Sequence, residues 1–143
     1  MILVLSKLNS INNLYLRIIT ALIGAVIVIS GIVHSPWTYF AIFFLVCFFS
    51  LLEFYKLVGL DGMIPLKSWG TFTGLTGYTI TFLVEMGVLH ARFFFLIFPL
   101  LFFVFFIKLY RKTDKKPFIN ITFTFLGILY VAVPFSLLHS VAF

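Results

Sequence analysis

Charged residues are scarce in this chain. Of its 143 residues only 10% are charged. Four residues are acidic, and one is a cysteine. A soluble domain carries about 25% charged residues, so this sequence has too few of them to cover a water-facing surface. The single cysteine, Cys47, excludes an internal disulfide and a cysteine-based metal cluster. The shortage of charge therefore excludes a soluble globular domain.

Long apolar runs take the place of the missing charge. Hydrophobic residues make up 63% of the chain, and the runs approach the roughly 20 residues that a helix needs to cross a bilayer. We expect an all-α, polytopic membrane protein with about five transmembrane helices in a single domain, residues 1–143. The predicted spans are 14–33, 37–55, 68–86, 92–110 and 118–139.

Basic residues are distributed unevenly among the gaps between these spans. Nine of the ten Lys and Arg residues lie in alternate gaps or at the span ends that border them, and the remaining gaps are bordered only by Arg92. Because positive charge is retained on the cytoplasmic side of membranes, the pattern predicts a cytoplasmic N-terminus. The net charge of +6 lies beside the spans. This placement favours anionic lipid headgroups over nucleic acid as partners. Each basic side chain near the membrane surface contributes roughly 1 kcal/mol of attraction to anionic lipid.

Small residues recur along one face of the third span. Gly70, Gly74, Gly77 and Thr81 follow helical spacing. Such a stripe lets another helix approach closely, which is how helices associate in lipid, and it allows a homodimer. A substrate groove along the same face is the alternative. The fourth span is instead rich in phenylalanine, and we expect it to face lipid.

Few residues have the spacing of a catalytic or metal site. Glu53, Asp61 and Asp114 lie on the predicted cytoplasmic side, and Glu85 lies near the outer end of the third span. Binding magnesium with a nucleoside triphosphate usually takes one or two neighbouring carboxylates, and no convincing set occurs here. The residues alone therefore assign no catalytic residue and no metal ligand. The basic loop 108–116 either anchors the topology or binds an anionic headgroup or nucleotide phosphate.

Three segments have a distinctive local sequence: NLYLRIITALIG at 13–24, LLEFYKL at 51–57, and KPFIN at 116–120 followed by GILYV and PFS. In order and spacing they resemble the bacterial phosphatidate cytidylyltransferases, the CDP-diacylglycerol synthases. The resemblance covers nearly the whole chain. In the second segment an acidic residue, Glu53, precedes an aromatic pair, as at the end of the family's second span.

The resemblance implies an enzyme of phospholipid biosynthesis in the bacterial inner membrane. Such an enzyme joins CTP and phosphatidate to give CDP-diacylglycerol and pyrophosphate, usually with magnesium. Arg17, Glu53 and Tyr130 match family positions and are expected in structural or substrate-groove roles. The expected groove and headgroup residues are Arg17, Glu53, Lys112, Lys115 and Lys116.

One departure from the family concerns its catalytic signature. The family's Ser-Pro-Lys-Lys-Thr-type run and its later His-Gly-Gly and Asp-Arg run are absent from these residues. We therefore expect the N-terminal half of such an enzyme, inactive alone, with CTP and magnesium bound by the other half. The alternative is a non-catalytic scaffold that pairs with a full-length partner through the face of Gly70, Gly74 and Gly77. A transporter or channel subunit is disfavoured because no span carries a central charged residue.

Overall fold

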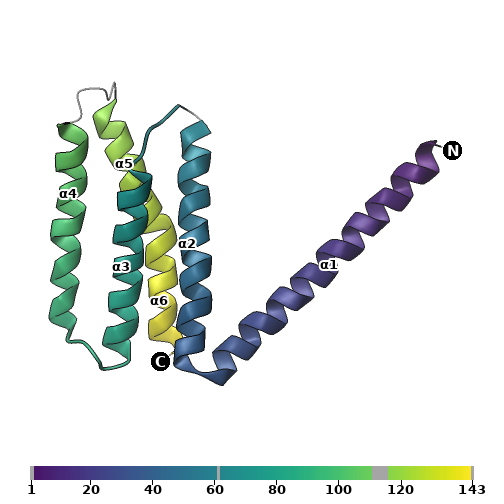
Figure 1. Cartoon of the computed structure of the whole chain (residues 1–143), viewed down its shortest axis with the longest axis horizontal. Coiled ribbons are helices and arrows are strands. Elements are labelled where there is room, and N and C mark those ends of the chain that lie inside the picture. The colour runs from purple at the N-terminus through teal and green to yellow at the C-terminus, as the bar shows by residue number, and fades with distance from the viewer. Residues whose placement is uncertain (1, 61, 111–115, 143) are drawn as a thin grey trace. The chain divides into compact units, whose positions relative to one another are not determined.

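The computed structural model describes the backbone of residues 2–60, 62–110 and 116–142, with side chains from Leu14 onward in these ranges. Every regular element in these ranges is a helix (Figure 1), which confirms the all-α prediction. The chain forms two compact units, one reaching to Ile42 and the other starting at Phe43.

The first unit contains helix α1 (Ile2–His34) and the first residues of α2 (Pro36–Leu60). From Leu14 onward nearly all side chains of α1 are exposed, although most are apolar. A helix that is apolar all round suits a lipid environment. Between the helices, the hydroxyl of Ser35 accepts a hydrogen bond from the backbone N–H of Trp37 at 3.3 Å. Gly31 lies against the side chain of Ile42, so α1 and α2 approach closely near this turn.

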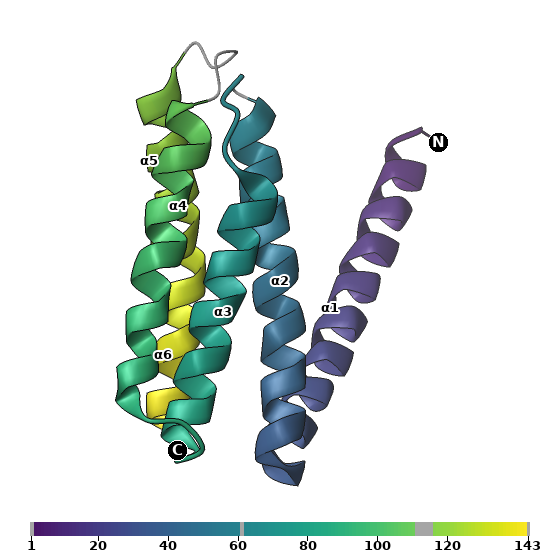
Figure 2. The same cartoon turned by 60° about the vertical axis from the view of Figure 1, so that its left-hand side comes forward.

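The second unit contains the remainder of α2 and the helices that follow it. These are α3 (Lys67–Glu85), the 3-10 helix η1 (Ala91–Leu96), α4 (Ile97–Leu109), α5 (Pro117–Gly127), the π-helix η2 (Ile128–Ala132) and α6 (Val133–Ala142). Figures 1 and 2 show α3 running beside α4 and beside the continuous rod formed by α5, η2 and α6. The predicted span at 118–139 is therefore one rod that contains a π turn.

The core of the second unit lies between α2 and the π turn. Residues of α2 spaced four apart lie on one face of the helix, and there they pack against residues of η2. The buried cluster consists of Cys47, Leu51, Tyr55, Ile128, Val131 and Ala132. Residues of the π turn are therefore part of the core of this unit.

Four helices among the described residues are long and apolar enough to cross a membrane. They are Leu14–His34, Pro36–Leu60, Ala91–Leu109 and Pro117–Ala142. Helix α3 has 19 residues, but its glycines and threonines lower its mean hydropathy. It nevertheless lies alongside α4 and α6 (Figure 2), so it occupies the same layer as the apolar helices.

Basic residues of the second unit gather at one of its ends. Helices α2 and α4 end there, and α3 and α5 begin there, as Figures 1 and 2 show. Lys56, Lys67, Lys108 and Lys116 all belong to this end. Arg92, in η1, belongs to the opposite end. The alternation read along the sequence thus corresponds to two differently charged ends of one unit.

Candidate functional site

The small-residue stripe of α3 has two halves with different surroundings. In the half nearer the basic end, Gly70 lies against the ring of Tyr55. A Cβ atom at Gly74 would lie 3.0 Å from Leu51 Cδ1 and 3.1 Å from Ala132 Cβ. These two glycines therefore allow α3 to pack against α2 and η2 within the chain.

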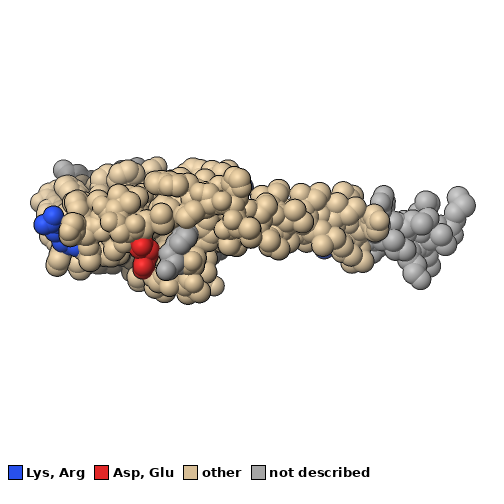
Figure 3. All heavy atoms as spheres, turned by 90° about the horizontal axis from the view of Figure 1, so that it is seen from below, with Lys and Arg blue, Asp and Glu red and all other residues tan. Residues whose placement is uncertain are grey.

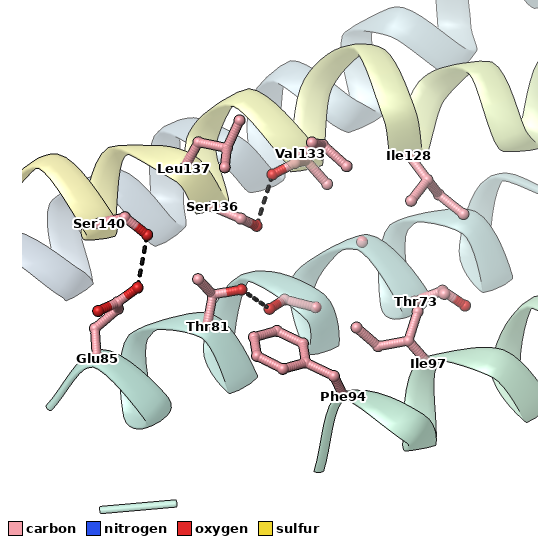
Figure 4. Close-up of a pocket in the computed structure, with 13 residues that line it drawn as sticks. Thr73, Thr81, Glu85, Phe94, Ile97, Ile128, Val133, Ser136, Leu137 and Ser140 are labelled. Carbon is pink, nitrogen blue, oxygen red and sulfur yellow. Dashed lines mark hydrogen bonds between the residues drawn. The ribbon is translucent and has the colours of Figure 1, made fainter. Parts of the chain in front are cut away.

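The other half of the stripe lines a groove between α3, α4 and α6 (Figure 4). Gly77 and Thr81 form its floor, where a Cβ atom at Gly77 would meet only Ile97 Cδ1, at 3.7 Å. The groove has a volume of about 320 Å³ and a mostly apolar lining. The full lining is Thr73, Gly74, Gly77, Thr81, Glu85, Phe94, Ile97, Ile128, Ala132, Val133, Ser136, Leu137 and Ser140. A cavity thus lies along the part of this face formed by Gly74, Gly77 and Thr81.

Hydroxyl groups in the groove are largely satisfied by their own helices. Thr81 donates to the carbonyl of Gly77 at 2.9 Å, and Ser136 donates to that of Ala132 at 2.8 Å. Thr73 differs, because its buried hydroxyl has no hydrogen-bond partner among the described residues. Most of the groove therefore presents hydrocarbon to whatever fills it.

A carboxylate stands at the mouth of the groove. Glu85 is the last residue of α3, and its Oε1 accepts a hydrogen bond from the hydroxyl of Ser140 at 2.6 Å (Figure 4). Beside Ser140, the imidazole of His139 is fully buried. Its ring centroid lies 4.4 Å from that of Tyr78 and 5.4 Å from that of Phe82. These contacts hold the end of α6 against α3 and fix the position of the mouth.

At the basic end, a different set of side chains holds the connection between α2 and α3. The ammonium of Lys108 donates to the carbonyl of Ile64. The backbone N–H of Ile64 donates to Asn120 Oδ1 at 2.8 Å, and that of Leu66 donates to Thr124 Oγ1 at 3.0 Å. Side chains of α4 and α5 thus satisfy backbone groups that a buried loop would otherwise leave unpaired.

We call Lys108, Asn120 and Thr124, which hold the connection between α2 and α3, the clamp. Tyr55 links the clamp to the core. Its hydroxyl donates to the carbonyl of Thr124 at 2.8 Å, and its side chain is fully buried. Gly70 of α3 and Gly127 of α5 both lie against its ring. One side chain of α2 therefore contacts two other helices at the same level.

Among the described residues, none of those predicted for the groove and headgroup site belongs to the lining of the cavity. Arg17 is exposed on α1 in the first unit, while Glu53 is exposed on α2 and belongs to the second unit. Lys116 is exposed and directly precedes α5. Lys112 and Lys115 lie outside the described residues. The structure thus places Glu53 and Lys116 toward the basic end of one unit and Arg17 in the other unit.

The side chains that form the clamp are not among the residues predicted from the sequence. The sequence pattern groups Lys108 with the basic loop 108–116, but the residue lies inside α4 with no exposed surface. Asn120 and Thr124 are polar residues one helical turn apart within an apolar segment. Polar residues in such segments usually face the protein interior, and that signal indicates their role.

The magnesium ion that the resemblance implies does not fit the described residues. They contain no group of three or more His, Cys, Asp or Glu side chains that could hold a metal ion. Glu53 lies toward the basic end of the second unit, whereas Glu85 lies at the opposite end. Asp61 and Asp114 fall outside the described residues. We therefore assign no metal ligand and no metal-dependent step to this part of the chain.

Comparison of the chain with protein-family models, with curated proteins and with solved structures gave no match. The class of the protein follows from its own structure. Its described residues form an α-helical protein with four helices long and apolar enough to span a membrane. The second unit has a clamped loop at its basic end and an apolar groove that extends toward its opposite end.

Proposed function

We propose that this chain is the N-terminal membrane portion of a phosphatidate cytidylyltransferase of the bacterial inner membrane. The complete enzyme would join CTP to phosphatidate, releasing pyrophosphate and forming CDP-diacylglycerol. These 143 residues would supply the lipid-embedded scaffold and part of the surface that receives phosphatidate. The catalytic signature and the magnesium ligands would lie outside them.

The observation that carries the proposal is the contact between two of the segments that resemble the family. Tyr55, from the segment at 51–57, donates its hydroxyl to Thr124 and lies against Gly127. The neighbouring ring of Phe54 lies 6.4 Å from that of Tyr130, between centroids. Segments separated by about 70 residues in the sequence therefore meet in one core, as expected if they were retained as parts of one structural unit.

Charge at the basic end supports a role at an anionic headgroup. Lys56, Lys67 and Lys116 are exposed there. Each such side chain near a membrane surface attracts anionic lipid by roughly 1 kcal/mol. Phosphatidate carries its charge on a compact phosphate, so these lysines would raise its local concentration at the end where the nucleotide is delivered. Phosphoryl transfer itself depends mainly on positioning and on metal-assisted charge stabilisation, which we assign to the proposed C-terminal half.

A split-enzyme assay tests this proposal. The chain would be co-expressed with the C-terminal half of a known bacterial phosphatidate cytidylyltransferase, and membranes would be assayed for CTP-dependent formation of CDP-diacylglycerol. We expect activity when both parts are present and none from this chain alone. Replacing the buried Tyr55 by Ala should abolish the rescue, whereas the same change at the exposed Tyr15 should preserve it.

Two outcomes would contradict the proposal. Activity from this chain alone would show that the catalytic residues are not elsewhere. A chain that is stable in the membrane and yet restores no activity to the C-terminal halves of several different enzymes would contradict the assignment to this enzyme.

The scaffold alternative receives less support from the packing. It requires the face of Gly70, Gly74 and Gly77 to receive a helix of another protein. Gly70 and Gly74 are already covered by side chains of the same chain, namely Tyr55 and Leu51. A Gly74→Leu variant should consequently unfold the second unit rather than separate two intact proteins in detergent.

A further inference from the structure

We propose that the groove between α3 and α6 holds one acyl chain of a phospholipid whose headgroup carries a primary ammonium group. This site is distinct from the phosphatidate surface discussed above, because its lining extends along α3 from Thr73 to Glu85, at the end of the second unit opposite the lysines. It also does not depend on the enzyme assignment. A scaffold with the same groove would bind the same lipid.

The interior of the groove is suited to hydrocarbon. Its volume of about 320 Å³ lies at the lower end of the range for ligand pockets, which is roughly 300–1,000 Å³. Side chains such as Ile97, Val133 and Leu137 form its walls (Figure 4). The hydroxyls of Thr81 and Ser136 donate to carbonyls of their own helices, so they do not require a polar ligand. Because α4 and α6 belong to segments long and apolar enough to cross a membrane, and α3 packs against both, the available apolar filler is a lipid chain.

The mouth of the groove selects the sign of the headgroup charge. Glu85 is exposed, and only one of its oxygens accepts the hydrogen bond from Ser140. An ionised carboxylate has about four lone-pair sites, so it can accept further hydrogen bonds from an ammonium group. Glu85 also ends α3, and the C-terminus of a helix carries a partial negative charge. Both features attract a cation and repel a purely anionic headgroup.

Basic side chains at this end leave the carboxylate available. Arg92 and His90 are exposed on the connection that leads into α4. Figure 3 shows the molecule from below, and there the acidic and basic atoms form separate small patches. A headgroup with both an ammonium and a phosphate matches this arrangement, with the ammonium at Glu85 and the phosphate directed away from it.

Photolabelling of the reconstituted full chain tests the proposal. Vesicles of phosphatidylcholine would contain a trace of phosphatidylethanolamine or of phosphatidylglycerol, each with the same diazirine-bearing acyl chain. After irradiation, labelled peptides would be mapped by mass spectrometry. We expect labels on the groove-lining residues of α3 and α6, and about threefold more from the ethanolamine lipid, as an exposed ion pair permits.

Three variants and one control separate the acyl site from the headgroup site. Gly77→Leu should fill the groove and reduce labelling by both lipids at least about fivefold, whereas Gly24→Leu, on an open face of α1, should change nothing. Gly77→Ala is the milder variant, because its Cβ fits, and it should give a smaller loss. Glu85→Gln should keep the labelling but equalise the two lipids.

Each contrary result overturns a stated part of the proposal. Unchanged groove labelling in a folded Gly77→Leu protein would show that the groove is not the acyl site. Equal labelling by the two lipids in the unmodified chain would remove the role of Glu85. If labelling fell as the protein density in the vesicles rose, and Ser140→Cys chains cross-linked to each other, a second copy would be the occupant instead.

Discussion

At the scale of single residues, Tyr55 determines which amino acids its neighbours on two other helices must be. A Cβ atom at Gly127 would lie 2.6 Å from atoms of its ring, and one at Gly70 would lie 2.8 Å from its Cζ atom. The ring cannot move aside easily, because its hydroxyl is bonded to the carbonyl of Thr124. Two glycines on different helices are thus required by one aromatic side chain.

Replacing Gly70 by Ala should therefore destabilise the second unit by about 2 kcal/mol, the usual range for overpacking in a core. The matched control is Gly24→Ala, because no atom lies within 4 Å of a Cβ built there. That change should stabilise α1 slightly, since alanine favours a helix over glycine by up to about 1 kcal/mol. Unfolding of both variants in mixed micelles, followed by circular dichroism, measures the difference. Equal stability of the two variants would contradict the packing of Tyr55.

Some residue-level features could be predicted from the sequence, and others could not. The spacing of Gly70 and Gly74 indicates a close helix contact, and the structure places both glycines at such a contact. Their partners, Tyr55 and Leu51, could not be identified, because spacing along one helix carries no information about which helix lies opposite. The burial of Lys108 was also hidden, since its partner is a backbone carbonyl of a distant loop.

At the scale of elements, the π turn η2 connects the clamped end of the second unit to its groove. A π turn contains i→i+5 hydrogen bonds and therefore holds one more residue than an α turn. Ile128 and Ala132 of this turn belong to the core and also line the groove. The extra residue changes the rotation of α6 relative to α5. The rod of α5, η2 and α6 can therefore place Thr124 in the clamp and Ser140 beside Glu85.

Deletion of Leu129, an exposed residue of this turn, should convert it to an α turn without rotating α6. Deletion of Leu137 should instead rotate the following residues by about 100° and move Ser140 away from Glu85. Cysteines placed at 85 and 140 in a Cys47→Ala background would report the contact through a short bis-maleimide. We expect cross-linking to survive the first deletion and to be lost in the second. Loss in both would contradict the role given to the π turn.

The sequence indicated the rod but not its π turn. Residues 118–139 are apolar on nearly all sides, so hydrophobic periodicity gives little information about the phase of the helix. The number and approximate limits of the helices follow from length and composition, and these were predictable. The local change in hydrogen bonding depends on the fit against Leu51 and Tyr55, which only the folded core determines.

At the scale of the whole molecule, the two ends of the second unit differ in charge. Lysines belong to the end where α2 and α4 finish, and the other end carries Glu85, His90 and Arg92. Cytoplasmic retention of positive charge predicts that the lysine-bearing end faces the cytoplasm. The sequence alone supports this orientation, and the structure adds that these lysines share one end of a single unit.

Cysteine labelling tests the orientation in living cells. In a Cys47→Ala background, Val88→Cys and Lys116→Cys place thiols at exposed positions of opposite ends. A membrane-impermeant maleimide should label position 88 in intact bacterial cells and position 116 only after the membrane is permeabilised. The reverse pattern would invert the topology and place the basic end outside the cell.

The threonine hydroxyls of α3 alter what its low hydropathy means. Thr76, Thr79 and Thr81 each donate to the carbonyl four residues earlier in the helix. Hydropathy scales assign to each hydroxyl the full free-energy cost of transfer out of water. A hydroxyl that already donates a hydrogen bond within its helix has a smaller transfer cost into hydrocarbon. Helix α3 is therefore more soluble in the bilayer than its composition suggests. Substituting valine at these three positions should leave its insertion into the membrane almost unchanged.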